Sequence, residues 1–169
     1  MIIRQEQPND FDNIYQLIRT AFETADAADG DEHDYALSLR NSDKYIPELA
    51  LVAEQHGKLI GHIMLTKTYI AADYGKIESL LLSPVSVLLE HRKKGVGASL
   101  INTALDIAEK LEYKAVFLCG DFKYYGKFGF ASVANYDVKP IMDTPIMYVL
   151  ARELKQGWLK NIKGTIDIV

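Results

Sequence analysis

The residues with the clearest chemical potential form a basic, glycine-containing turn. Arg92, Lys93 and Lys94 precede Gly95 and Gly97, and an apolar helical pattern begins directly after them. The first N–H groups of a helix have no partners within the helix, and they carry about half a positive charge. Glycines remove the Cβ atoms that would keep an anion away from the backbone. The pattern predicts a phosphate or pyrophosphate site, and a solvated basic turn is the plain alternative.

Two better-known phosphate motifs do not fit this turn. A Walker-type loop requires G-x-x-x-x-G-K-[ST], but Gly97 is followed by Ala98. A Rossmann fingerprint requires G-x-G-x-x-G after a strand, and Leu100 stands where the third glycine belongs. Asp121, after the next predicted strand, could mimic the ribose-binding acid of that fold. A nicotinamide-binding Rossmann enzyme is therefore kept as the weaker alternative.

The chain resembles the GNAT superfamily of N-acetyltransferases over roughly residues 2–150. The acetyl-CoA signature of that superfamily is [QR]-x-x-G-x-[GA], and residues 92–97 match it in full. The resemblance implies that the preceding strand splays and that its main-chain groups bind the pantetheine arm. Leu89 and His91 depart from a common proline and a common aromatic residue. The implied cofactor contacts are Val85, Ser86, Val87, Arg92, Lys93, Lys94, Gly95, Val96, Gly97, Ala98, Tyr125 and Phe128.

Tyr125 is the second residue to which the resemblance gives a role. It stands four residues before the pair Gly129-Phe130, where GNAT proteins often carry the tyrosine that protonates the departing CoA thiolate. A phenol of pKa about 10 still holds its proton near neutral pH, when a thiolate of parent pKa about 8.5 needs one. Ordinary packing is the alternative for a tyrosine here. This segment looks like that of a bacterial subgroup of small predicted acetyltransferases whose acceptors are mostly undefined.

A general base is harder to choose, because an ammonium acceptor must lose a proton before it attacks the thioester and no base motif exists. Glu78, early on the long central strand, is the first candidate, although strand alternation could also place it on the outer surface. Glu54, His62 and Asp121 are the alternatives. A main-chain N–H near Val87 is expected to polarise the acetyl carbonyl.

Two further features bear on the site. Cys119 ends an apolar strand, and we expect a small buried hydrophobe there rather than an acetyl-carrying nucleophile. The segment from Thr24 to Asp34 carries five carboxylates, on Asp26, Asp29, Asp31, Glu32 and Asp34. In GNAT folds this segment helps to wall the acceptor site, so its charge favours a cationic amine. A solvated acidic loop is the alternative, and His33 within it has no assigned role.

Hydrophobic periodicity predicts the elements that position these residues. Strands are expected at residues 2–4, 49–54, 59–67, 77–88, 115–119, 131–138 and 147–150. Helices are expected from a cap at Asp10, at residues 35–40, after Gly95, and around Tyr124-Tyr125 with a stop at Gly129. The tail at residues 151–169, with Trp158, is expected to pack back on the core.

This order predicts an α/β (α+β) fold with a mixed sheet of six to seven strands. The sheet should be mostly antiparallel, because hairpins join most strands, with one parallel pair at the strand–helix–strand crossover and helices on both faces. The chain has 169 residues, which suits a single N-acetyltransferase domain over 1–169 with its core at 2–150.

Composition excludes several classes. A net charge of -4 argues against a nucleic-acid partner, and one cysteine excludes a disulfide framework or a multi-cysteine metal site. Because the apolar runs are short and the first residues lack a signal-peptide pattern, we expect a cytoplasmic protein with no membrane partner.

Together these features predict an acetyl-CoA-dependent N-acetyltransferase that transfers acetyl directly to a primary amine, without a metal. A non-catalytic acyl-CoA-binding sensor is the other alternative, and a homodimer is compatible with the chain.

Overall fold

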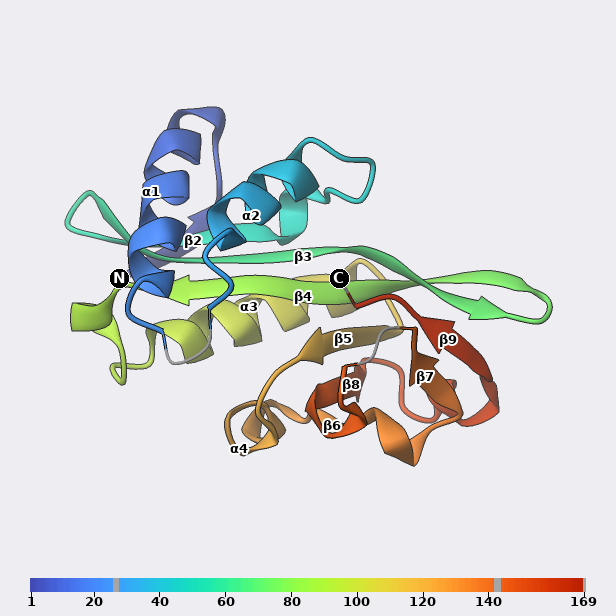
Figure 1. Cartoon of the computed structure of the whole chain (residues 1–169). Helices are drawn as coiled ribbons and strands as arrows, with labels where there is room; N and C mark the ends of the chain where they lie inside the picture. The colour runs from blue at the N-terminus through green and yellow to red at the C-terminus, as the bar shows by residue number, and fades with distance from the viewer. Residues whose placement is uncertain (26–27, 142–143, 169) are drawn as a thin grey trace. The chain divides into compact units, whose positions relative to one another are not determined.

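The computed structural model describes residues 1–25, 28–141 and 144–168, and the chain forms two compact units. Unit 1 comprises Met1–Thr66 and Ser83–Ile107, and unit 2 comprises Lys67–Leu82 and Ala108–Val169. The long strands β3 (Lys58–Ala72) and β4 (Gly75–Val87) contribute one end to each unit (Figure 1). The single domain over 1–169 stays a prediction.

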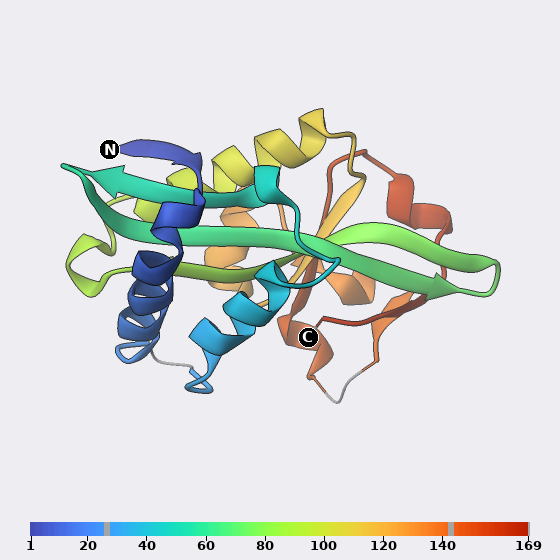
Figure 2. The same cartoon turned by 90° about the horizontal axis from the view of Figure 1, so that it is seen from above.

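Unit 1 is a sheet with helices on both faces. β1 (Ile2–Gln5) pairs antiparallel with β2 (Ala50–Gln55), which pairs antiparallel with β3. Helices α1 (Phe11–Phe22) and α2 (Glu32–Arg40) lie on one face and α3 (Val96–Lys110) on the other (Figures 1 and 2). Val52 of β2 packs with Ile14 and Ile18 of α1, whereas Gly61 of β3 lies against Leu100 of α3. The predicted arrangement of helices is confirmed in this unit.

Unit 2 contains the crossover that the sequence predicts. β5 (Ala115–Cys119) pairs parallel with β4, matching Leu80 to Val116. β8 (Val149–Glu153) pairs antiparallel with β5 and with β6 (Ala131–Ser132). β9 (Gly164–Ile166) pairs antiparallel with β3 and parallel with β7 (Val138–Pro140). The strand order is β1-β2-β3-β4-β5-β8-β6, so the mixed, mostly antiparallel sheet is confirmed.

The C-terminal tail packs as expected. Leu159, Ile162 and Ile166 are buried in one cluster with Phe117 of β5 and Val149 of β8. Trp158 packs against the same cluster. The apolar residues of the tail therefore complete the core of unit 2.

Two predicted strands in unit 2 are largely turns. Residues 131–138 form β6, a 3-10 turn at Val133–Asn135 and then β7, because the Ser132 hydroxyl accepts the Ala134 N–H and bends the chain. The run at 147–150 begins with a 3-10 turn at Ile146–Tyr148, where Tyr148 donates its N–H to the carbonyl of Pro145. β8 therefore starts at Val149. Both runs carry the right composition, but local hydrogen bonds shorten the strands.

The start of α1 also differs in detail from the prediction. Asp10 occupies the N-cap position, but its carboxylate makes no cap hydrogen bond to α1. Instead it accepts the Gln7 N–H at 2.8 Å and pairs with the Arg4 guanidinium at 2.7 Å. Arg4 also donates to Glu54 at 2.9 Å. Asp10 therefore ties the segment ahead of α1 to β1 rather than capping the helix.

A buried ion network fastens α2 to the sheet in unit 1. Arg40 donates from Nε and Nη2 to the two carboxylate oxygens of Glu6, at 2.7 and 2.9 Å. Tyr45 donates its hydroxyl to Glu6 at 2.9 Å, and His62 Nε2 lies 2.9 Å from the same carboxylate. The side chains of Glu6 and His62 have no exposed area. Two ionised side chains therefore sit inside the unit with their charges paired.

The network determines which ring nitrogen of His62 carries a hydrogen. Burial alone would raise the pKa of Glu6, but hydrogen bonds from His62 and Arg40 lower it to about 2. A carboxylate only accepts, so His62 Nε2 carries the donated hydrogen. Burial lowers the pKa of His62, which is neutral, and its Nδ1 has no partner among the described residues. His62 is sealed from solvent, so the structure does not support it as a general base.

Glu6→Gln should lower the free energy of unfolding by about 3–5 kcal/mol, because Arg40 is then buried without a counter-charge. Glu54→Gln is the matched control: Glu54 pairs with Arg4, but its side chain is 28% exposed, so its loss should cost at most about 1 kcal/mol. Urea unfolding at pH 7 measures both. Equal stabilities of the two variants would contradict the role given to the network.

Acidification should destabilise unit 1 in two stages. Because the pKa of His62 is lowered from 6.5 in the folded chain, the unfolded chain alone takes up that proton below pH 6.5, and stability falls as the pH drops. Glu6 adds a further loss between its ordinary pKa of 4.5 and about 2. His62→Gln keeps the N–H donor and does not titrate, so its stability should fall less steeply between pH 6.5 and 5, by up to about 1.4 kcal/mol per pH unit. The free energy of unfolding is measured by urea titration at each pH. If it falls equally steeply with decreasing pH in the wild type and in His62→Gln, the assignment is wrong.

Candidate functional site

The basic turn after β4 leads into α3 through two left-handed residues. β4 ends at Val87, a 3-10 turn follows at Leu89–His91, and α3 starts at Val96. Lys93 has φ 59° and Gly95 has φ 83°. A Cβ on Gly95 would meet no atom within 4 Å, so glycine is favoured there by its backbone angle and the space beside it is open. Ser99 donates to the Gly95 carbonyl at 2.9 Å, the first hydrogen bond of the helix.

The three basic residues of the turn have different environments. Lys93 and Lys94 are exposed. Arg92 is half-buried and donates from Nε to the Val87 carbonyl at 3.0 Å and from Nη1 to the Thr24 carbonyl at 2.9 Å. Its Nη2 donates to the Ala21 carbonyl at 2.5 Å and to Thr24 Oγ1 at 3.0 Å. The expected rim charge is therefore carried by the lysines, because the Arg92 guanidinium is bound to protein oxygens.

Val96 and Gly97 begin the helix at a point fixed by β3. The Val96 side chain is 4% exposed, and its Cγ1 lies 3.1 Å from where a Cβ on Gly61 would stand. The Leu100 Cδ1 atom lies 3.0 Å from the same point. A side chain at position 61 would therefore push α3 away. Val96 can offer a ligand only its main chain, as the sequence resemblance implies for this turn.

The last residues of β4 alternate in burial. Val85 and Val87 are half-buried, whereas Ser86 is 3% exposed and its Oγ has no partner among the described residues. The Ser86 carbonyl lies 3.1 Å from the position of a Cβ on Gly61, so β3 and β4 approach closely here. The three residues are thus available to a ligand mainly through the backbone.

In unit 2, the ring of Tyr125 packs directly against the backbone of Gly120. β5 ends at Cys119, and α4 (Phe122–Tyr125) follows after Asp121, whose carboxylate accepts the Lys123 N–H at 2.9 Å. A Cβ on Gly120 would come within 2.5 Å of Cε2 of Tyr125, so only glycine lets the ring lie there. Gly120 is not among the site residues predicted from the sequence, although a glycine directly after an apolar strand often marks a close approach to the backbone.

The environment of Tyr125 keeps its hydroxyl protonated. The ring packs edge-on against Tyr124 and Phe130, with ring centroids 5.0 and 6.0 Å apart. Burial, with smaller contributions from Tyr124 and Cys119, raises the pKa of Tyr125 well above its usual range. The hydroxyl therefore holds its proton at neutral pH, but it gives that proton up less readily than an ordinary phenol does. The role of Tyr125 as the acid stays a prediction.

Two neighbours of Tyr125 differ from expectation. Cys119 is exposed rather than buried, because it is the last residue of β5, and partial burial raises the pKa of its thiol. A raised pKa disfavours a nucleophilic thiolate. Phe128 is 7% exposed and packs edge-on against Tyr124 at 5.5 Å. The resemblance implies that Phe128 contacts the cofactor, but little of its ring surface is accessible.

The sequence's first choice of base lies far from Tyr125 within unit 2. Glu78 is exposed, and it precedes Leu80, which pairs with Val116 near the start of β5. Tyr125 follows the opposite end of β5. At about 3.3 Å per residue, the length of β5 separates the two ends by more than 10 Å. Glu78 is exposed on the hairpin of β3 and β4, the alternative placement that strand alternation allowed, and its role as the base stays a prediction.

The other base candidates are already engaged. Glu54 pairs with Arg4, His62 is sealed against Glu6, and Asp121 caps α4. The structure thus presents none of the four side chains as a free base.

Two carboxylates of the acidic segment after α1 already accept hydrogen bonds from groups of the protein. Glu32 accepts the N–H groups of Asp29 and Gly30, at 2.5 and 3.1 Å, and these bonds start α2 three residues earlier than predicted. Asp34 accepts the Tyr15 hydroxyl at 2.7 Å. Asp29 and Asp31 are exposed, and Asp26 lies outside the described residues. The charge available to an acceptor is smaller than the five carboxylates indicated.

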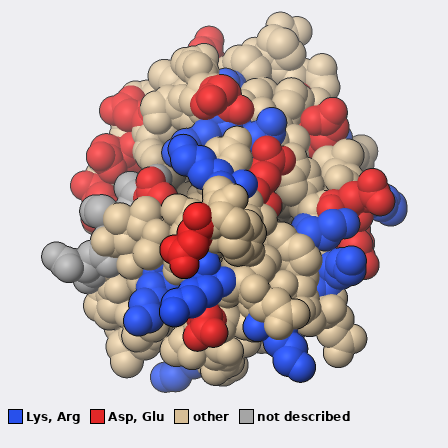
Figure 3. Space-filling model, turned by 90° about the vertical axis from the view of Figure 1, so that its right-hand side faces the viewer, with Lys and Arg blue, Asp and Glu red and all other residues tan. Residues whose placement is uncertain are grey.

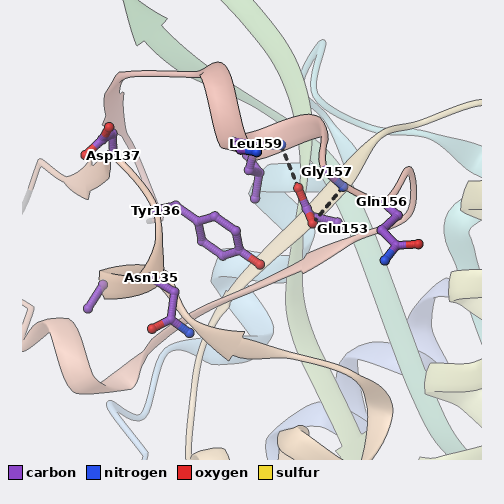
Figure 4. Close-up of a pocket in the computed structure, with 9 residues that line it drawn as sticks. Asn135, Tyr136, Asp137, Glu153, Gln156, Gly157 and Leu159 are labelled. Carbon is purple, nitrogen blue, oxygen red and sulfur yellow. Dashed lines mark hydrogen bonds between the residues drawn. The ribbon is translucent and has the colours of Figure 1, made fainter.

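Unit 2 also contains a polar cavity of about 440 Å³. Its wall includes Glu153, whose carboxylate accepts the N–H groups of Gly157 and Leu159 (Figure 4). Glu153 pairs with Ala115, and Cys119 pairs with Val149 at the other end of β8, so the cavity lies away from Tyr125. The remaining lining residues are Ala134, Asn135, Tyr136, Asp137, Gln156 and Lys160.

Metal clusters and membrane-spanning helices are both absent from the described part of the chain. Within residues 1–25, 28–141 and 144–168, no cluster of three or more His, Cys, Asp or Glu side chains could hold a metal ion. No helix in the same ranges has the length and apolar composition needed to cross a membrane. On the face shown in Figure 3, basic and acidic side chains are intermingled rather than separated.

Known proteins share both the sequence and the fold. Residues 2–133 match the family described as an acetyltransferase (GNAT) domain. The uncharacterized N-acetyltransferase YjhQ of Escherichia coli K12 is 29% identical over 128 residues, which cover 76% of this chain and 68% of that protein.

Two solved structures are similar over almost the whole chain. The N-acetyltransferase YhbS of Escherichia coli, crystallised with CoA, has a TM-score of 0.85 at 24% identity and covers 98% of this chain and 88% of its own. A GNAT acetyltransferase of Brucella melitensis, crystallised with acetyl-CoA, has a TM-score of 0.79 at 25% identity and covers 98% and 93%. The sheet and its crossover do not match the Rossmann alternative. The chain belongs to the GNAT family of acetyltransferases.

Proposed function

We propose that this protein is an acetyl-CoA-dependent N-acetyltransferase that moves acetyl directly to a primary amine of a small molecule or peptide. The observation that carries the proposal is the turn at residues 92–97, which has the family's signature, an open left-handed Gly95 and a helix start directly behind it. Similar proteins crystallised with CoA and acetyl-CoA support the same donor.

The pyrophosphate is assigned to the start of α3. The free N–H groups of the first helical turn, Val96 to Ala98, would donate to its oxygens, and Lys93 and Lys94 would balance its charge. Val85, Ser86 and Val87 would bind the pantetheine arm through their main chain. A main-chain N–H near Val87 would polarise the acetyl carbonyl.

Transfer needs one bond to form and one to break. The amine nitrogen attacks the thioester carbonyl carbon, the C–N bond forms, and the C–S bond breaks with its electron pair on sulfur. Tyr125 gives its hydroxyl proton to that sulfur, which leaves as the CoA thiol, and the tyrosinate then takes a proton back from solvent. We assign removal of the amine proton to water, since the four expected protein bases are engaged or distant. Among the acceptors, cationic amines are favoured by the exposed Asp29 and Asp31.

Cytoplasmic location and homodimer formation belong to this proposal as well. An enzyme that consumes acetyl-CoA must share a compartment with it. The assembly state can be measured by light scattering during size-exclusion chromatography.

Calorimetry with CoA tests the phosphate assignment. Gly97→Asp should weaken CoA binding by about tenfold or more, because a carboxylate near the pyrophosphate repels it. Gly97→Ala is the control, since the family signature allows alanine there and no charge is added. An acid in the first turn favours the helix itself, so lost binding would not reflect unfolding. Equal CoA affinity in Gly97→Asp and Gly97→Ala would refute the site.

Tyr125→Phe should lower the single-turnover rate of acetyl transfer by about 10²–10⁴, because the leaving thiolate loses its acid. CoA affinity should stay within about twofold. CoA thiol release is followed over a panel of polyamines, aminoglycosides and lysine peptides, with NAD as a binding control. Tyr124→Phe, a change of the neighbouring ring, should keep the rate.

An unchanged rate in Tyr125→Phe would remove the acid role. Thiol release with no amine, despite tight acetyl-CoA binding, would favour the sensor alternative instead.

A further inference from the structure

Arg92 joins its own turn and the nearby end of β4 to the end of α1, which is distant in the chain. Arg92 begins the turn at residues 92–97, called the phosphate turn below. It donates to Val87 at the end of β4, and also to Ala21 and Thr24 at the end of α1. These last partners are 71 and 68 residues earlier in the sequence. Four hydrogen bonds thus link the phosphate turn, the strand before it and the start of the segment between α1 and α2.

The chemistry of this contact suits arginine alone. The last carbonyls of a helix have no partners within the helix and carry partial negative charge, which a guanidinium satisfies. A planar fork with five N–H donors can reach Val87 on one side and Ala21 and Thr24 on the other, whereas a lysine ammonium cannot span them. Thr24 Oγ1 completes the contact by accepting from Nη2 while it donates to the Ala21 carbonyl at 3.1 Å.

We propose that Arg92 is a positioning residue that makes the phosphate turn and the end of α1 move as one body. The proposal rests on the function proposed above, since it gives Arg92 a part in the same cofactor site. A ligand held at the turn stabilises the Arg92 contacts and therefore the last turn of α1. Cofactor binding is in this way transmitted to Thr24 and Ala25, the described residues that follow the last turn of α1.

The last turn of α1 offers a direct readout. The amides of Glu23, Thr24 and Ala25 donate to the carbonyls of Arg19, Ala21 and Phe22, at 3.0, 3.3 and 3.0 Å. Hydrogen–deuterium exchange of these amides reports how often the turn opens. A second readout, calorimetric affinity for CoA, reports the phosphate site independently.

Hydrogen exchange should be compared in the wild type, Arg92→Lys and Thr24→Val, each with and without CoA. Without CoA, the three amides should exchange about tenfold faster in both variants, because charge-assisted hydrogen bonds are lost. Saturating CoA should slow them about tenfold in the wild type and less than twofold in the variants. Thr24→Ser, which keeps the hydroxyl, should restore wild-type behaviour. Lys94→Gln should weaken CoA binding without changing exchange in the free protein.

The outcomes separate this inference from the proposed function. If the wild type binds CoA but Arg92→Lys and Thr24→Val both exchange as the wild type does, the inference is wrong and the function stands. If Arg92→Lys loses CoA affinity while Thr24→Val keeps both affinity and wild-type exchange, Arg92 is a phosphate ligand and the inference is also wrong. If the wild type does not bind CoA, the proposed function falls, and exchange in the free variants still decides whether Arg92 holds α1.

Discussion

The position of α3 depends on the missing side chain at Gly61. Val96 and Leu100 occupy the volume that a Cβ would need, so the helix begins close against β3. The turn between β4 and α3 contains two left-handed residues, Lys93 and Gly95. A Cβ at position 61 would require its neighbours, the tips of Val96 and Leu100 and the Ser86 carbonyl, to give way by a few tenths of an ångström.

Two charged contacts with different energetics hold the helices of unit 1. The Glu6–Arg40 pair is sealed in the interior, where ionised groups are tolerated only because every charge is matched. Arg92 instead binds carbonyl oxygens near the surface, where each hydrogen bond is weaker and can open. The first contact fixes α2, and the second leaves the end of α1 responsive to its surroundings. The difference in burial assigns a structural role to one arginine and a positioning role to the other.

Local patterns in the sequence gave the long elements correctly. The apolar stripe of α3, the hairpin of β2 and β3, and the apolar run of β5 all lie within a few residues of their predicted bounds. The bonding of Arg92 could not be predicted, because its partners at the end of α1 are about 70 residues away in the chain. β5 ends at Cys119 as predicted, but the exposure of that residue depends on what packs beside the end of the strand, which the composition of the strand does not determine. Patterns therefore identified the residues of the site, and distant contacts decided what each side chain does.

In the proposed mechanism, the protein supplies groups for only one of the two proton transfers. Tyr125 is held by a glycine that admits no other residue and by two aromatic edges, and burial keeps its proton in place. Of the side chains that the sequence offered as bases, Glu54 is bound to Arg4, His62 to Glu6 and Asp121 to a backbone N–H group, and Glu78 is exposed on the hairpin. The proposed mechanism therefore has a protein side chain for the leaving group and none for the amine. The amine then has to arrive already deprotonated or lose its proton to solvent, so acceptors are selected partly by the pKa of their own nitrogen.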